Sequence, residues 1–267
     1  MSLDSLFDDL RKRVGSKSAR QLHYDGEVDY LLSAAKPETK KQVVGLCVSL
    51  ESIAFWKICV GIVKCGQDER TDAILQGYEF YDLALRSRYQ ASPKKITIQA
   101  DNVAFYVALG LALERRGGIV ELFSPLLNSN VIYKPFENGL ASFVSLLAEA
   151  AITGEAPRQS DGQSLGPYQP IIDYWDNDES VVSTITELCD IRLEKATDPA
   201  MDSVFCRAPF CVFPVELVAL HRVRISQGHE FRLPEHSVLL PFLVNHVPQV
   251  DREDDVLRAA INKLEIV

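Results

Sequence analysis

Apolar residues recur every three or four positions along most of this chain. This spacing places them on one face of an α-helix. The longest such segment runs from Pro37 to about Val63 and is apolar on more than one side, which predicts a central helix that other elements cover. Its apolar residues are Val43, Val44, Cys47, Leu50, Ile53, Ala54, Ile58, Val60 and Ile62.

The same spacing, together with caps, prolines and glycines at the ends, predicts helices along the rest of the chain. A second helix is expected to end before Pro93, and a third to run from about Gln99 to Arg116. Either Asp178 or Ser180 is the expected cap of a clear amphipathic helix further on. The later helices are expected at about 120–127, 137–152, 170–175, 180–193, 214–228, 234–246 and 254–264.

Strand signals are few. The candidates are Lys95–Ile98 and Cys206–Phe213, and Pro209 weakens the second because proline cannot donate to a ladder. The segment 153–166 carries three Gly, one Pro and few apolar residues, so it is predicted to be a loop.

These patterns predict an all-α fold, either an irregular multi-helix bundle or stacked helical hairpins, with about ten helices. We expect a single domain over residues 1–267, with sublobes 1–152 and 167–267 joined by the loop 153–166. No repeat period of 30 to 45 residues is convincing, and a degenerate repeat stays open.

The overall charge argues against nucleic acid as the partner. The net charge is −9, and the basic residues are scattered, the longest run being 11–13. A phosphate-binding surface needs clustered Lys and Arg, since phosphate neutralisation supplies most of its affinity. An acidic surface instead favours solubility and attracts basic partners.

The cysteines and the apolar segments indicate a cytoplasmic protein. Six cysteines in 267 residues do not make a disulfide scaffold, and most lie in apolar stretches where a free thiol packs as a small hydrophobe. The N-terminus resembles no signal peptide. The apolar segment 43–63 is interrupted by polar residues such as Glu51 and Lys57, so we expect a buried helix and no membrane association.

One motif resembles a hydrolase nucleophile. Gly162–Gly166 matches G-x-S-x-G, a pattern that needs its serine between a buried strand and a helix. The preceding residues, 155–161, are too polar for a buried strand, and Pro167 follows directly. The motif is therefore interpreted as part of the loop.

Metal and cofactor patterns also fail. Cys206, Cys211, His221 and His229 are separated by four, nine and seven residues, which differs from zinc-finger spacing. His229 begins an H-E-x-x-H-like run, but Leu233 replaces the second histidine. Phosphate-binding loops are absent from the sequence. We therefore predict no metal, no cofactor, no catalytic residue and no enzymatic activity.

Two acidic clusters precede predicted helices. Acids are favoured there because a helix N-terminus carries partial positive charge, worth about 0.3–1 kcal/mol per acid. The cluster at 251–255 needs no other explanation. The cluster at 173–179 surrounds a Tyr-Trp pair that we expect to be exposed, a composition typical of binding hot spots. The predicted partner-binding residues are Asp173, Tyr174, Trp175, Asp176, Asp178 and Glu179.

A further charged group lies at the end of the amphipathic helix. Asp190 and Glu194 are four residues apart, whereas Arg192 points elsewhere. We expect Arg192 to form a buried or inter-helix ion pair with a carboxylate such as Glu216, a structural role. If the protein were an enzyme, His221 with Asp190 or Glu216 would be the first place to look.

The C-terminal third resembles a known family. The segments Leu188–Ala196, Phe213–Leu220 and Arg224–Gly228 resemble the ending of bacterial polymorphic-toxin immunity proteins, in particular the family called immunity protein 49. Elsewhere the chain is similar in length, helicity and charge. Members are helical, cytosolic proteins that bind one cognate toxin delivered by neighbouring cells, so the resemblance implies an inhibitor without turnover.

The sequence thus leads to three functional hypotheses. The first is an immunity protein that occludes a basic toxin, with the acidic cluster steering association. The second is a helical scaffold or adaptor that binds a protein or peptide in a groove. The third is an enzyme of unrecognised type. The toxin's identity and the oligomeric state stay open.

Overall fold

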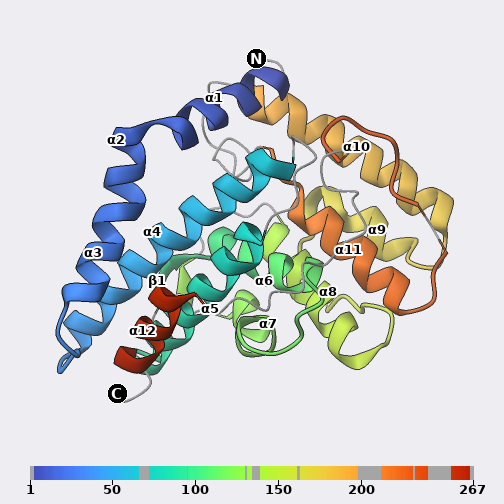
Figure 1. Cartoon of the computed structure of the whole chain (residues 1–267). Coiled ribbons are helices and arrows are strands. Elements are labelled where there is room, and N and C mark those ends of the chain that lie inside the picture. The colour runs from blue at the N-terminus through green and yellow to red at the C-terminus, as the bar shows by residue number, and fades with distance from the viewer. Residues whose placement is uncertain are drawn as a thin grey trace. The chain divides into compact units, whose positions relative to one another are not determined.

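The computed structural model describes residues 3–65, 72–94, 96–129, 131–133, 139–160, 163–197, 212–230, 232–239 and 254–264, and these are mostly helical (Figure 1). The predicted all-α fold of about ten helices is confirmed. In the described residues, the helices are interrupted by two short strands, β1 (Ile96–Gln99) and β2 (Ile132–Tyr133), which pair with each other. β1 overlaps the predicted strand Lys95–Ile98 over Ile96–Ile98, and most of the other candidate lies outside the described residues.

Contacts along the chain define two compact units. The N-terminal unit comprises Asp4–Ile96 and His246–Val267, and the middle unit comprises Met1–Leu3 and Thr97–Asn245. The segment 153–166, where the sequence predicts the join between two sublobes, lies inside the middle unit. The division falls elsewhere because the last helix, α12 (Asp255–Leu264), packs on α3 (Gly26–Ser33) and α5 (Ala73–Ala91) of the N-terminal unit.

The core of the N-terminal unit is α4 (Lys40–Cys65), packed along α5. Two glycines allow the helices to approach closely. A Cβ on Gly61 would lie 2.3 Å from Ile74 Cγ1, and one on Gly77 would lie 2.8 Å from the carbonyl oxygen of Ala54. Neither position has room for a side chain, so small residues at both sites permit the close packing that buries half of the residues of α4.

By length and composition, α4 is long and apolar enough to cross a membrane. However, 67% of its most apolar window is buried inside the protein. A core helix covered on most sides has the same composition, so its burial accounts for its apolar character. This agrees with the predicted central helix.

Short helices at the start of the chain cover part of α4, and the sequence analysis did not predict them. Of these, α3 and the π-helical turn η1 contact α4. Lys263 of α12 fixes the end of α3 by donating hydrogen bonds to the carbonyls of Leu31, Leu32 and Ala34, at 2.6, 2.9 and 2.6 Å. The elements before α3 are α1 (Leu3–Gly15), α2 (Lys17–Arg20) and η1 (Gln21–Asp25).

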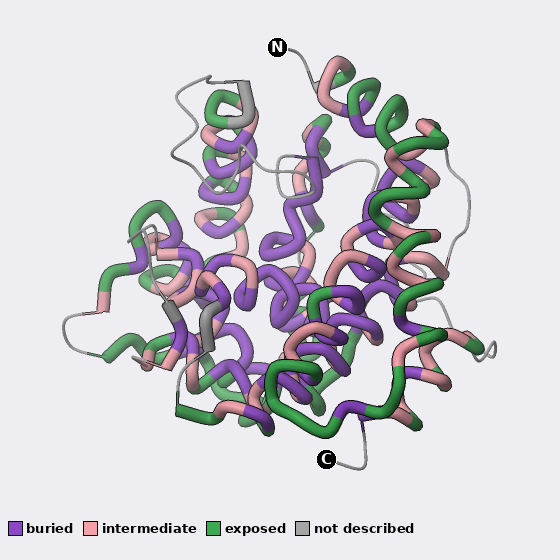
Figure 2. The backbone as a smooth tube through the Cα atoms, turned by 90° about the vertical axis from the view of Figure 1, so that its left-hand side faces the viewer, coloured by how far each residue is buried: buried purple, intermediate pink, exposed green. Residues whose placement is uncertain are grey.

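The core of the middle unit is α6 (Ala100–Ala112), which is buried at every residue except Asn102. It contacts α8 (Leu140–Thr153) and α11 (Val215–Ser226). Figure 2 shows buried and exposed residues alternating along individual helices, the pattern from which the helices were predicted. The remaining elements are α7 (Ile119–Phe123), η2 (Pro125–Asn128), η3 (Gly166–Tyr168), α9 (Gln169–Asp173) and α10 (Asp178–Thr197).

The end of the third predicted helix and the helix predicted from Pro234 differ from the structure. The third helix ends at Ala112, before the expected Arg116, because Glu114 adopts a left-handed conformation with φ 58°. The helix predicted from Pro234 is wrong over 234–239, which form irregular structure and a turn. There the His236 ring accepts a hydrogen bond from the Val238 amide, which competes with helix formation.

Candidate partner-binding surface

The predicted partner-binding residues form the connection between α9 and α10, here called the acidic turn (residues 173–179). Tyr174 is 54% exposed, and Asp173, Asp176 and Glu179 are also exposed. Trp175, in contrast, is only 4% exposed. The expectation of an exposed Tyr-Trp pair was therefore wrong for Trp175, which anchors the turn while its neighbours face solvent.

Backbone hydrogen bonds determine the course of the acidic turn. The Tyr174 amide donates to the Pro170 carbonyl at 3.0 Å and ends α9. The Ser180 amide donates to Asn177 Oδ1 at 3.0 Å, so Asn177 caps α10 in place of the predicted Asp178 or Ser180. Asp178 instead lies in the first turn of α10, where a negative charge favours the helix N-terminus.

Arg224 of α11 holds the acidic turn from inside. Its side chain is fully buried, and its guanidinium donates hydrogen bonds to the Trp175 carbonyl and to the Asp178 carboxylate. The same guanidinium lies 5.0 Å from the centre of the Trp175 ring and 3.2 Å from His229 Nδ1. Burial lowers the pKa of Arg224, and Asp178 and Asp176 oppose that shift. The cation therefore joins two helices at the base of the turn.

Gln227 extends this anchorage to α8. The Trp175 indole N–H donates to Gln227 Oε1 at 3.2 Å. The Gln227 amide nitrogen donates to the carbonyls of Ala150 and Glu155, at 3.1 and 2.8 Å. The acidic turn is thus fixed to the end of α8 and to the start of the loop that follows it. Such contacts preorganise a surface, because the turn loses little conformational freedom when a partner binds.

A second charged group, around Arg192 and Glu216, is buried in the middle unit. Arg192 and Glu216 form an ion pair with side chains 2% and 5% exposed, which confirms the predicted pair. Tyr168 Oη lies 3.5 Å from Glu216 Oε1, and its ring stacks on Phe143 at 4.5 Å. Burial and the nearby Glu216 charge raise the pKa of Tyr168 well above its usual value. The group is closed to solvent, which fits the predicted structural role.

Asp190 is separate from that buried group. Its side chain is 70% exposed and lies 3.2 Å from His236 Nε2. In the described residues, no three His, Cys, Asp or Glu side chains gather where they could hold a metal ion. Cys206 and Cys211 of the zinc-like spacing lie outside the described residues, as does Gly162 of the serine motif.

The sequence analysis missed Arg224 as the organising residue, although a signal was present. Arg224 follows Leu217 by seven residues and Leu220 by four, and both leucines are fully buried. The spacing of α11 therefore carries Arg224 into the interior with them. A buried cation needs a partner, and the acidic cluster supplies one in Asp178.

Comparison with known proteins identifies no relative: no family model, no curated protein and no solved structure matches this chain. The resemblance to the immunity protein 49 family therefore stays a prediction.

Proposed function

We propose that this protein is a cytoplasmic immunity protein that binds a basic bacterial toxin through the acidic turn and occludes it without turnover. The main support is the way Arg224 and Gln227 hold the turn while Asp173, Tyr174 and Asp176 stay exposed. A fixed, acidic, aromatic surface is suited to recognising a protein, and the C-terminal sequence resemblance favours a toxin as that protein.

Electrostatic attraction between the acidic protein and a basic toxin would act before the two proteins touch. The chain carries a net charge of −9, and the acidic turn adds a local concentration of carboxylates. Such a field steers a basic partner and raises the association rate, an effect screened beyond about 10 Å at 0.1 M salt. Binding should therefore weaken as salt is added, mainly through slower association.

Tyr174 would supply the contact energy. It is the large exposed aromatic at the centre of the turn, with Asp173 and Asp176 on either side. Tyrosine is enriched at hot spots because it offers a rigid apolar ring and a hydroxyl. Burial of this ring in a toxin pocket would fix the register, and the surrounding acids would pair with Lys or Arg at the rim.

Neutralisation in cells tests the proposal. Each toxin domain found among the genes that flank this one is expressed with the wild-type protein or with an Asp173→Lys/Asp176→Lys variant, and growth is measured. We expect the wild type to restore growth and the variant to fail. Glu187→Lys is the control for charge reversal elsewhere, because Glu187 is an exposed acid of α10 outside the acidic turn. The proposal is wrong if wild-type protein restores no growth, or if both variants protect equally.

A further inference from the structure

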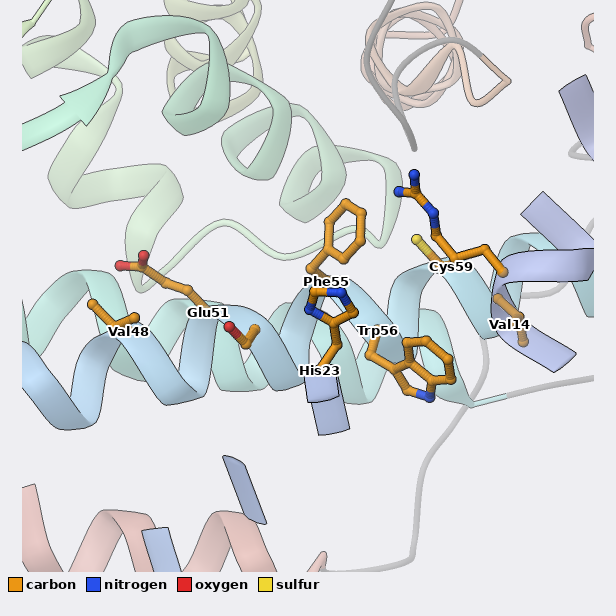
Figure 3. A pocket seen from close by; sticks show the side chains of 9 residues that line it. Val14, His23, Val48, Glu51, Phe55, Trp56 and Cys59 are labelled. Atoms are coloured by element: carbon orange, nitrogen blue, oxygen red, sulfur yellow. The ribbon is translucent and has the colours of Figure 1, made fainter. Parts of the chain in front are cut away.

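A pocket of about 410 Å³ opens beside α4 in the N-terminal unit, away from the residues used above. Ligand pockets usually range from about 300 to 1,000 Å³. In Figure 3 the side chains of Glu51, Phe55 and Cys59 project from the same side of α4, and the His23 ring reaches in from η1. These α4 residues are four apart, so one stripe of the helix forms a wall of the pocket.

The walls are mainly apolar and aromatic. Phe55 and Trp56 contribute two aromatic side chains, and Val14 closes one side from α1. Val48, which is 48% exposed, forms the edge of the pocket. Aromatic rings favour other rings in offset or edge-on arrangements, which adds about 0.5–1.5 kcal/mol to the burial of apolar surface. The shape and lining therefore suit a flat, apolar group.

Glu51 is the polar group with a fixed orientation in this pocket. Its Oε1 lies 2.7 Å from Arg88 Nη2 of α5 and is shielded from solvent, although the side chain as a whole is 25% exposed. Burial raises the pKa of Glu51, and Arg88 opposes that shift. Arg88 thus holds the carboxylate from behind, and the exposed quarter of the side chain lines the pocket, where a ligand can donate to it.

The charges around the pocket select against a cation. Arg88 already balances Glu51, and Arg13 and His23 lie among the lining residues. A cationic ligand would be repelled by Arg13. It would also lose the water around its own charge without finding an anion that lacks a partner. A neutral donor avoids both costs.

We propose that this pocket binds a small neutral aromatic molecule whose hydroxyl or ring N–H donates a hydrogen bond to Glu51. This site is independent of the proposed toxin-binding surface. The aromatic ring packs against Phe55 and Trp56, and the donor points toward the Glu51 carboxylate.

Phenol and fluorobenzene are suitable probes, because they have similar size and only phenol carries the donor. We expect phenol to bind with a Kd of about 1 mM in an NMR titration. Fluorobenzene should bind at least about tenfold more weakly, since a hydrogen bond to a charged group is worth more than about 1.4 kcal/mol. The chain has two tryptophans, so the indole N–H signal of Trp56 should shift while that of Trp175 stays.

A blocking variant locates the site. Val48→Phe should fill the entrance and abolish phenol binding, whereas Ile152→Phe in the middle unit should leave it unchanged; both parent residues are 48% exposed, so neither change should unfold the protein. Three results would overturn the proposal: no saturable phenol binding up to about 10 mM, equal affinity for the two probes, or unchanged phenol binding by Val48→Phe.

Discussion

Arg224 and Asp178 are 46 residues apart in the sequence, yet the buried guanidinium of one donates to the carboxylate of the other. The same guanidinium holds the Trp175 carbonyl, so a residue inside α11 determines the position of a turn on the surface. This relationship explains why the acidic turn has a defined shape although most of its side chains face solvent.

Removing this cation should destabilise the protein. Arg224→Ala should lower the free energy of unfolding by about 3 kcal/mol, because two charge-assisted hydrogen bonds and a buried cation–π contact are lost. Urea titration gives the loss. Arg222→Ala is the control on the same helix: its partner Glu114 is 58% exposed, so the loss should stay below about 1 kcal/mol. Similar losses in the two variants would show that Arg224 does not organise the turn.

The buried pair of Arg192 and Glu216 should behave as a coupled unit. Either Arg192→Met or Glu216→Leu alone should cost about 3–5 kcal/mol, since each leaves a buried charge without its partner. The double variant should cost clearly less than the sum, because no unpaired charge is left. Urea titrations of the four proteins give the coupling energy. Additive losses would contradict the direct pair.

Glu114 offers a stabilising change. A residue with a side chain in the left-handed conformation costs about 1–2 kcal/mol, and glycine avoids that cost. The ion pair that Glu114 makes with Arg222 at 3.5 Å is partly exposed and compensates little. We expect Glu114→Gly to raise the free energy of unfolding by about 1 kcal/mol. Glu121→Gly, within α7 (Ile119–Phe123), is the contrasting control and should lower it.

Two buried thiols should make stability fall at alkaline pH. Burial raises the pKa of Cys47 and of Cys189 to about 12, against about 8.5 for a thiol in an unfolded chain. Between these values the unfolded chain loses thiol protons that the folded protein keeps. The free energy of unfolding should therefore be highest below about pH 8.5 and decrease above it by about 1.4 kcal/mol per pH unit for each thiol.

Comparison with a Cys47→Ala/Cys189→Ala variant isolates this effect, because other titrating groups are common to both proteins. Urea titrations from about pH 8 to 10 should give the wild type the steeper decline. Parallel declines would mean that the two thiols ionise as easily in the folded protein as in the unfolded chain.

Much of the fold could be predicted because the helical spacing is local. The residues from Val181 to Leu193 carry enough apolar positions to define α10. Arg192 follows the buried Ile185 by seven residues and the buried Leu188 by four, so the same period places it inside, where it forms the expected ion pair. The helix α2, by contrast, has no buried residue and hence no apolar period to detect. Its helical form depends on Ser16, whose hydroxyl accepts from the Ala19 amide at 3.3 Å.

The candidate surface was less predictable because its arrangement depends on distant residues. Tyr174 and Trp175 have similar neighbours in sequence, yet one is exposed and the other buried. The difference arises from Arg224 and Gln227, about fifty residues later in the chain. Similarly, Lys263 reaches carbonyls at the end of α3, a contact that no local pattern indicates.

The most direct test of partner binding is the Kd for the purified toxin domain that the growth assay identifies, measured calorimetrically for the wild type, Tyr174→Ala and Asp173→Lys/Asp176→Lys. We predict tight wild-type binding, at least a tenfold increase in Kd for each variant, which is about 1.4 kcal/mol, and no change for Glu187→Lys. A wild-type complex whose Kd is unaffected by changes at Tyr174, Asp173 and Asp176 would contradict the acidic turn as the binding surface, and the absence of any complex would contradict the proposed function itself.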